Sequence, residues 1–445
     1  AAAVSGVDAV VYSSAIKPDN VALVEARRIE VPCLRRAECL SAILHTRKGV
    51  LVAGTHGKTT TSAMCAHVLN NAGAAVSHYV GAEIPVLGAN AHWDEGSEYL
   101  VAEGDESDGT LDLYQPAYAV VLNIEEEHLD HYKGLQQIVG VFRTLLEQTS
   151  GKVIYCREDS TAYELCSQYE GGLSYGWSDA DYTAVDVAEG RGVIAFTVLR
   201  RGEEMGRVEL GIPGRHNVLN ALAAIALADD LQLDFSCVTR ALSSFAGAKR
   251  RFESVYLSPR FHVIDDYGHH PTEITATLQT ARSLEPNRIV ALFQPHRYSR
   301  TELLAAEFGK ALQGADLVFV TGIYAASENP IDGVSGMTIL EAVEQHGSTK
   351  CVYHEDLSTV HHIVGNALKA GDLLLTLGAG NIHEAGKRIS ADLQLVDLLK
   401  GEFAESDIEI KLYESMRRHT TMLVGGPAQF WIEPRTFSAF AGAVN

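Results

Sequence analysis

Residues 50–61 read VLVAGTHGKTTT, and this stretch decides the fold. An apolar run enters it and a helical pattern leaves it, as in loops that bind phosphate between a strand and a helix. The usual loop has the form G-x-x-x-x-G-K-[ST], whereas only Thr55 and His56 separate Gly54 from Gly57 here. We therefore predict a shortened phosphate loop; the alternative is a tight turn followed by an exposed lysine.

The residue types of this loop suit the phosphates of a nucleotide. Glycines let the backbone turn tightly and aim N–H groups at phosphate oxygens, and the following helix N-terminus adds partial positive charge. Lys58 would bridge the β- and γ-phosphates, and the hydroxyl of Thr59 would bind Mg²⁺. The residues of the predicted nucleotide site are Gly54, Thr55, His56, Gly57, Lys58, Thr59 and Thr60.

Two further strand ends carry side chains that could bind a metal ion beside the phosphates. Glu103 ends the predicted strand YLVAE, and the acidic loop GDESD follows it. His128 follows another strand, within NIEEEHLDH. Because Mg²⁺ prefers hard oxygen ligands, the carboxylate of Glu103 is a candidate ligand. A solvated loop explains Glu106 and Asp108 equally well, and a structural role explains His128 equally well.

Short β-branched runs alternate with segments of helical apolar spacing along most of the chain. This alternation predicts an α/β fold of parallel sheets covered by helices. The exception is a predicted hairpin at 192–199 and 207–212, joined by RRGEEMG. We place domain boundaries near 45–49 and 247–251, and a further break near 400–407. The predicted strands are 8–12, 49–53, 99–103, 118–123, 152–155, 262–265, 288–293, 316–321 and 372–377.

Length, charge and cysteine usage narrow the class of protein. The 445 residues are enough for two or three domains. The formal net charge of −21 argues against a nucleic-acid partner, and the absence of an apolar run of about 18 residues argues against a membrane span. The seven cysteines form no CxxC pair, which suits a reducing cytoplasm rather than a disulfide framework or a zinc ribbon.

Seven motifs occur in order along the chain: GTHGKTTT at 54–61, VAEGDESD at 101–108, NIEEEHLD at 123–130, GRHNVLN at 214–220, RRFE at 250–253, DDYGHHPT at 265–272 and FQPHRYSRT at 293–301. Together they closely resemble the Mur ligase family of peptidoglycan synthesis, and within it the enzymes that add L-alanine to UDP-N-acetylmuramate. The resemblance covers roughly residues 1–395.

This resemblance implies a three-domain α/β fold and a reaction in the cytoplasm that uses ATP and Mg²⁺. The domains would be a partial Rossmann-like UDP-substrate domain at 1–47, a central P-loop ATPase domain with a parallel sheet at 48–248, and a C-terminal Rossmann-like domain at 249–400. In the implied reaction the carboxylate of UDP-N-acetylmuramate attacks the γ-phosphate, giving an acyl phosphate and ADP. The amine of L-alanine then attacks the acyl carbon and releases phosphate.

The resemblance also implies roles for single residues. Thr59 and Glu103 would hold one Mg²⁺, and His128 would help to hold a second. Without the resemblance, the asparagines of GRHNVLN would be read as helix caps and HRYSR as a solvated helix start. The residues implied at ATP are Lys58, Asn217, Asn220, Arg251 and Asp265, and those implied at the alanine and the carboxylate are Tyr267, His269, Arg297 and Arg300. The residues expected to act in catalysis are Lys58, His128, His269, Arg297 and Arg300.

Two features depart from the family pattern. Members begin with a strand and a glycine-rich turn that holds the UDP diphosphate. This sequence lacks that turn, and its resemblance to the first domain begins near residues 10–16, at about the last third of that domain. We therefore expect a segment cut from a longer polypeptide. Some relatives carry a carbamylated lysine near the metal, and no lysine near 176–181 suggests one here.

Residues 407–445 fall outside the ligase resemblance. HTTMLVGGPA at 419–428, followed by FWIEP, is similar to the start of the UDP-N-acetylenolpyruvoylglucosamine reductase family, at the edge of its FAD-binding domain. An ordinary strand–turn–strand is the alternative, since Gly-Gly-Pro is a common turn. The similarity predicts a ligase–reductase fusion, in which only a complete reductase part would bind FAD.

Three other functions stay open from the sequence alone. They are a sibling ligase that attaches a tripeptide to UDP-muramate, a reductase polypeptide whose ligase part is a scaffold, and a non-catalytic nucleotide-binding protein. The residues that line the pocket for the amine would distinguish the first of these from an L-alanine ligase. Intact catalytic positions argue against the other two: Lys58, Thr59, Glu103, His128 and Arg297.

Overall fold

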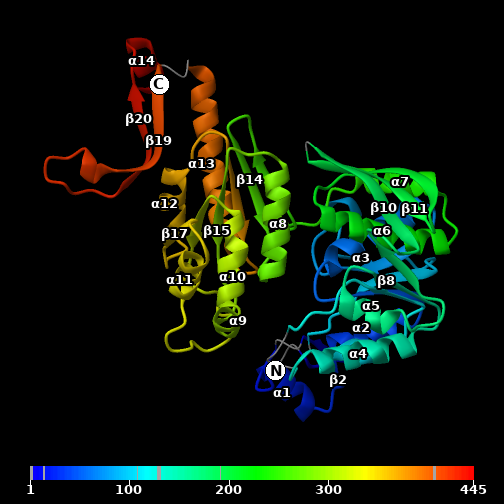
Figure 1. Cartoon of the computed structure of the whole chain (residues 1–445). Helices are drawn as coiled ribbons and strands as arrows, with labels where there is room; N and C mark the ends of the chain where they lie inside the picture. The colour runs from blue at the N-terminus through cyan, green and yellow to red at the C-terminus, as the bar shows by residue number, and fades with distance from the viewer. Residues whose placement is uncertain are drawn as a thin grey trace. The chain divides into compact units, whose positions relative to one another are not determined.

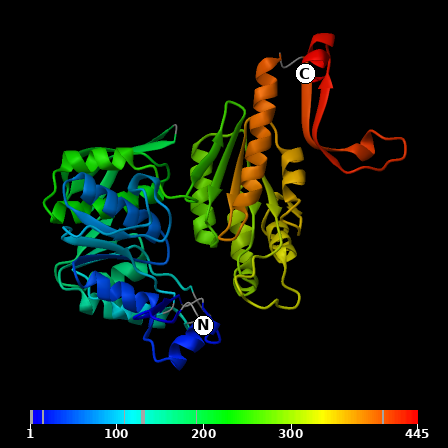
Figure 2. The ribbon, with the colours of Figure 1, turned by 180° about the vertical axis from the view of Figure 1, so that it is seen from behind.

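The computed structural model describes residues 4–13, 16–107, 109–127, 132–190, 192–403 and 407–444. They form two compact units, Ala1–Ala248 and Lys249–Asn445, and each is built on a mainly parallel sheet with helices (Figures 1 and 2). The α/β class predicted from the alternation of strands and helices is confirmed.

A ten-stranded sheet forms the first unit, in the order β12-β11-β10-β9-β8-β7-β3-β6-β4-β5. The strands from β10 to β4 pair in parallel, whereas β11, β12 and β5 pair antiparallel. A short parallel pair of β1 and β2 precedes this sheet. The strands are β1 (Val10–Tyr12), β2 (Cys33–Arg35), β3 (Lys48–Ala53), β4 (Val76–Tyr79), β5 (Ala91–His92), β6 (Tyr99–Glu103), β7 (Tyr118–Val121), β8 (Lys152–Cys156), β9 (Leu173–Gly176), β10 (Tyr182–Gly190), β11 (Val193–Arg200) and β12 (Glu203–Leu210).

Helices cover both faces of this sheet, as parallel strands require. The central strand β3 is fully buried from Val50 to Ala53, with Val50 and Val52 in one core layer and Leu51 and Ala53 in the other. The layer of Val50 contains α3 (Lys58–Asn71), α6 (Arg215–Asp230) and α7 (Phe235–Ser244). The layer of Leu51 contains α2 (Arg36–Leu44), α4 (Leu135–Gln148) and α5 (Ser160–Cys166), while α1 (Val21–Arg28) packs beside β2.

The predicted hairpin exists, but its connection is shorter than expected. Strands β11 and β12 are antiparallel, and only Arg201 and Gly202 join them, with φ angles of 51° and 84°. Two positive φ angles in a two-residue loop match the twist of the flanking strands. Glutamates 203 and 204, Met205 and Gly206 therefore belong to β12 rather than to the loop.

The second unit contains a six-stranded sheet in the order β13-β14-β18-β15-β16-β17, parallel except for β13. One face is covered by α8 and α10, in front in Figure 1, together with α11; the other is covered by α13, in front in Figure 2, together with α12. The strands are β13 (Glu253–Leu257), β14 (Phe261–Asp266), β15 (Arg288–Phe293), β16 (Leu317–Val320), β17 (Lys350–Tyr353) and β18 (Asp372–Leu377). The helices are α8 (Pro271–Ser283), α9 (Tyr298–Leu303), α10 (Ala305–Ala311), α11 (Gly336–His346), α12 (Val360–Ala367) and α13 (His383–Glu402).

A C-terminal hairpin packs on α12 and α13 within this second unit. It consists of β19 (Ile408–Ser415) and β20 (Pro427–Pro434), followed by α14 (Phe437–Val444). The hydroxyl of Tyr413 donates to Asp392 on α13, and Asn366 on α12 donates to the carbonyl of Leu412 at 2.9 Å. A Cβ on Gly365 would meet the Tyr413 ring at 2.9 Å, so the absent side chain makes room for that ring.

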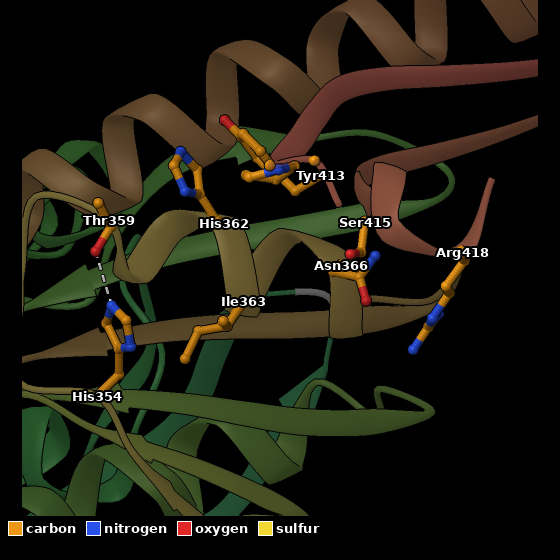
Figure 3. A pocket seen from close by; sticks show the side chains of 11 residues that line it. His354, Thr359, His362, Ile363, Asn366, Tyr413, Ser415 and Arg418 are labelled. Carbon is orange, nitrogen blue, oxygen red and sulfur yellow. Dashed lines mark hydrogen bonds between the residues drawn. The ribbon is translucent and has the colours of Figure 1, made fainter. Parts of the chain in front are cut away.

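A pocket of about 370 Å³ lies where this hairpin meets α12. In Figure 3, Tyr413 lies against His362, and His354 bonds to Thr359, at 2.8 Å. The ring centroids of Tyr413 and His362 are 4.6 Å apart. The pocket is therefore lined by side chains of both the hairpin and α12.

Within the part of the chain that the structure describes, no helix has the length and apolar character needed to cross a membrane.

A partly buried ion pair, in which the Arg288 side chain is 29% exposed, joins two neighbouring strands of the second unit. Arg288 on β15 lies opposite Asp372 on β18 and donates to both of its carboxylate oxygens, at 2.9 and 2.5 Å. The Asp372 side chain is 1% exposed. Removing only one partner of such a pair leaves an uncompensated buried charge.

We predict that Arg288→Ala lowers the free energy of unfolding by about 3–5 kcal/mol, measured by urea denaturation followed by circular dichroism. Arg282→Ala is the matched control, because Arg282 and Asp316 form a 2.8 Å pair whose side chains are 45% and 39% exposed. That substitution should cost under about 1 kcal/mol. Equal losses from the two variants would contradict this reading of the Arg288 pair.

Candidate active-site residues

The stretch predicted to be a phosphate loop leads from β3 into α3. Strand β3 ends at Ala53 and helix α3 begins at Lys58. Gly54 and Gly57 have φ angles of 149° and 84°, which side chains rarely adopt. A Cβ on Gly54 would also lie 3.0 Å from Leu122. The strand–loop–helix arrangement is therefore confirmed, and both glycines are required by the backbone.

Asn123 holds the middle of this loop and was not singled out from the sequence. Its side-chain oxygen accepts from the N–H of His56 at 2.7 Å, and its amide donates to the carbonyl of His56 at 3.1 Å. The hydroxyl of Thr55 accepts from the N–H of Glu125 at 2.9 Å. The position of Asn123 just after β7, the strand beside β3, was the available signal. The loop is thus held in shape by its neighbouring strand end.

Lys58 is turned toward protein acceptors. Its Nζ donates to the carbonyls of Gly54 and Thr55, at 2.5 and 3.0 Å, and to the carboxylate of Glu106, at 2.8 and 3.0 Å. Burial lowers the pKa of Lys58, but the charge and hydrogen bonds of Glu106, with Glu103 and Asp105, outweigh it and the net pKa is raised. Lys58 therefore carries a full positive charge at neutral pH.

Thr59 and Glu103 meet at the start of α3, as predicted for a metal site. The hydroxyl of Thr59 donates to Glu103, at 3.0 and 3.1 Å from its two oxygens. Glu103 ends β6, lies opposite Val52 of β3 and accepts from the N–H of Gly81 at 2.8 Å. A hydroxyl and a carboxylate are the hard oxygen donors that Mg²⁺ takes. The pair fits Mg²⁺, whereas His128 lies outside the described residues.

The two predicted adenine residues lie on α6, beside the loop. Asn217 and Asn220 are buried, and Asn220 donates to the side-chain oxygen of Asn217 at 3.1 Å. A Cβ on Gly57 would lie 3.2 Å from the side-chain oxygen of Asn220. The structure therefore brings Asn220 against the phosphate loop. Thr60, in the first turn of α3, is buried as well.

In the second unit, Asp265 is engaged by internal partners. Its carboxylate accepts from Arg250 at 2.9 Å and from the hydroxyl of Thr376 at 2.5 Å, and the residue is 3% exposed. Arg251, which the resemblance also assigns to ATP, pairs with Glu273 at 3.5 Å. The guanidinium carbons of Arg250 and Arg251 both lie 5.1 Å from the centre of the Tyr267 ring.

Three of the residues predicted to face the alanine (Tyr267, His269 and Arg300) form a cluster with His296, which the sequence analysis did not single out, whereas the side chain of Arg297 lies 3.9 Å from Glu328. The ring centroid of His296 lies 5.5 Å from that of His269, which is 5.4 Å from Tyr267. Arg300 reaches the Nδ1 of His296 at 3.3 Å. Arg297 precedes α9 with a φ of 70°, a left-handed conformation that is costly outside glycine. His296 lies inside the motif FQPHRYSRT, which was its only signal.

Comparisons with known proteins show the family of the chain. A model of the Mur ligase middle domain matches residues 52–228, and one of the Mur ligase glutamate ligase domain matches residues 250–380. A UDP-N-acetylmuramate–L-alanine ligase of Pelotomaculum thermopropionicum is 42% identical over 398 residues, which are 88% of this chain and 85% of the relative. The chain belongs to the Mur ligase family.

Other Mur ligases support the same assignment. The UDP-N-acetylmuramate–L-alanine ligase of Desulforamulus reducens is 41% identical over 87% of this chain and 85% of the relative. The solved structure of the UDP-N-acetylmuramate–alanine ligase of Thermotoga maritima has a TM-score of 0.76 at 32% identity, covering 87% of this chain and 86% of that one. The predicted Mur ligase fold is confirmed.

The C-terminal hairpin lies outside both Mur ligase family models. The second of them ends at residue 380, before β19 begins at Ile408. The similarity of residues 407–445 to a reductase, and with it any binding of FAD, stays a prediction.

Asp266, at the end of β14, makes the free energy of unfolding depend on pH. Burial raises its pKa to about 6, although Arg251 and the N–H groups of Gly268 and Phe252 act against this. Between pH about 4 and about 6 an unfolded Asp is ionised while folded Asp266 keeps its proton. The stability from this group is therefore present below pH about 4 and is lost as the pH rises to about 6.

We predict that Asp266→Asn flattens the pH dependence of unfolding in this window. The free energy of unfolding of the wild type should fall by about 1–3 kcal/mol more than that of the variant between pH 4 and 6.5. Urea denaturation at a series of pH values measures both. Parallel pH profiles would show that Asp266 titrates at its ordinary pKa.

Proposed function

We propose that this chain joins L-alanine to the carboxylate of UDP-N-acetylmuramate, using ATP, in the cytoplasm. The observation that carries the proposal is the shortened phosphate loop, with Lys58 and the Thr59–Glu103 pair at its end, in a chain 42% identical to a ligase of that name. The loop supports ATP as phosphate donor, and the relatives' names support the two other substrates.

The chemistry explains why a phosphate donor is needed. A carboxylate does not acylate an amine at neutral pH, because its oxygen is too poor a leaving group. Transfer of the γ-phosphoryl group to the carboxylate oxygen gives an acyl phosphate and ADP. The amine then attacks the acyl carbon, the C–O bond to phosphate breaks, and the amine loses a proton. The products are an amide and inorganic phosphate.

The first unit supplies the groups that handle ATP in this proposal. Two anions must approach each other in the phosphoryl transfer, and the charge of Lys58 offsets their repulsion. Backbone N–H groups at the start of α3 bind phosphate oxygens. Thr59 and Glu103 would hold Mg²⁺, which supplies further positive charge at the phosphates. Asn217 and Asn220 would bind the adenine.

The second unit supplies side chains suited to the other substrates. The guanidinium groups of Arg297 and Arg300 can pair with carboxylate or phosphate oxygens through two N–H groups. Tyr267 and His269 lie in the same cluster as Arg300 and are assigned to the alanine. The family pattern assigns Arg251 and Asp265 to ATP.

We expect the chain to release phosphate from ATP and Mg²⁺ only when UDP-N-acetylmuramate and an amine are both present. L-Alanine, glycine, L-serine and a tripeptide are compared as amines in a phosphate-release assay, and L-alanine should be preferred. Preference for the tripeptide would reassign the chain to the recycling branch of the family. Phosphate release that does not depend on any amine would contradict a ligase.

Lys58→Ala should abolish this turnover because it removes the cation beside the phosphates; the variant should still fold, with lower stability because Glu106 loses its cation. Circular dichroism and thermal unfolding check the fold. Lys48→Ala is the matched control: Lys48 begins the same strand and forms an exposed ion pair with Glu98. Activity retained by the Lys58 variant would mean that this lysine is structural.

A further inference from the structure

The cation that should meet phosphate is already surrounded by protein oxygens. An ammonium group has three hydrogens. In Lys58 they face the Gly54 and Thr55 carbonyls and both oxygens of Glu106, all within 3.0 Å. The Lys58 and Glu106 side chains are 15% and 3% exposed. A phosphate oxygen must therefore displace one of these acceptors to reach Lys58.

Glu106 is held in place by bonds that do not involve Lys58. Its main-chain carbonyl accepts from the buried hydroxyl of Tyr132 and from the N–H of Gly109, the latter at 3.2 Å. The loop that carries it begins at Gly104, whose N–H donates to Val52 of β3 at 2.8 Å. A Cβ on Gly104 would meet Leu111 at 2.8 Å, so this loop packs tightly on the core. The main chain at Glu106 is therefore fixed independently of Lys58, and a movement of Lys58 leaves this loop in place.

We propose that Glu106 is a positioning residue: it is the counter-ion that holds Lys58 within the loop, and Lys58 leaves it to bind the phosphates of the nucleotide. This inference rests on the proposed function, since it takes the loop to bind ATP. A buried carboxylate that loses its cation is costly. Glu106 thus opposes the binding of a nucleotide that arrives without a divalent cation, and a divalent cation on the phosphates reduces that opposition.

This exchange differs from two simpler roles of Glu106. If Glu106 only stabilised the fold, its removal would change stability and leave nucleotide affinity unchanged. If it were required as a metal ligand, its removal would weaken binding in the presence of Mg²⁺ and leave metal-free binding unchanged. A counter-ion that competes with phosphate has the opposite effect, because removing it tightens metal-free binding.

The test is the affinity of the whole protein for a fluorescent ADP analogue, measured in EDTA and in Mg²⁺. Glu106→Gln removes the charge while keeping the size of the side chain. Asp105→Asn is the matched control, because it removes the same charge from the neighbouring residue, whose carboxylate pairs with Arg36 at 3.2 Å and is 40% exposed. Thermal unfolding of each protein confirms that it is folded.

We expect Glu106→Gln to bind the metal-free analogue about tenfold more tightly than the wild type, and Asp105→Asn to stay within about threefold of it. The gain should shrink when Mg²⁺ is present. Glu106→Asp, which keeps the charge but withdraws it from Lys58, should give a smaller gain and tests the inference if the glutamine variant does not fold.

If the wild type binds the analogue but the Glu106→Gln and Asp105→Asn variants bind it equally well without metal, the role of Glu106 is overturned and the proposed function is not. Weaker binding by Glu106→Gln in Mg²⁺ would also overturn it, in favour of a metal ligand. A wild type that binds no nucleotide with Mg²⁺ would overturn the proposed function together with the inference.

Discussion

The burial of β3 on both faces is the constraint on which the candidate site depends. Its side chains alternate between two core layers, so a shift of one residue would exchange every one of them between layers. The strand therefore has one register, and Ala53 has one position. The loop that follows starts from that fixed point, and Asn123 of the adjoining strand end holds its middle. The geometry of the phosphate loop is thus set by packing that involves no ligand.

The polar groups of this site are paired with other protein groups. Lys58 lies against Glu106, and the Thr59 hydroxyl lies against Glu103. Each of these protein partners occupies a direction that the ligand would use, a phosphate oxygen in the first case and a metal ion in the second. A site organised in this way needs little rearrangement of its backbone to change partners, because the exchange involves the ends of side chains.

The sequence predicted those parts of the site that depend on local pattern. The strand–loop–helix around Lys58 and the carboxylate at the end of β6 follow from alternation, glycine spacing and the rule that parallel strand ends share one edge. Asn123 and His296 were not singled out, and Glu106 was explained equally well as part of a solvated loop, because their contacts are with neighbours distant in the chain. Strand β10 was missed because its outer half is solvent-exposed and carries charged residues, which hide the apolar alternation. The hairpin loop was predicted to be too long because Arg201–Gly202 was not recognised as a two-residue turn with two positive φ angles.

The contact between Tyr413 and Gly365 bears on where this polypeptide can be divided. The model of the Mur ligase glutamate ligase domain ends at residue 380, yet Leu412 and Tyr413 belong to the same buried cluster as α12 and α13. A chain ended just after α13 would lose the ring that fills the space above Gly365 and would leave the Asp392 carboxylate without the Tyr413 hydroxyl and the Gln429 amide. The smallest piece that keeps this core whole therefore extends to the end of β20, well past the limit that family resemblance alone would suggest.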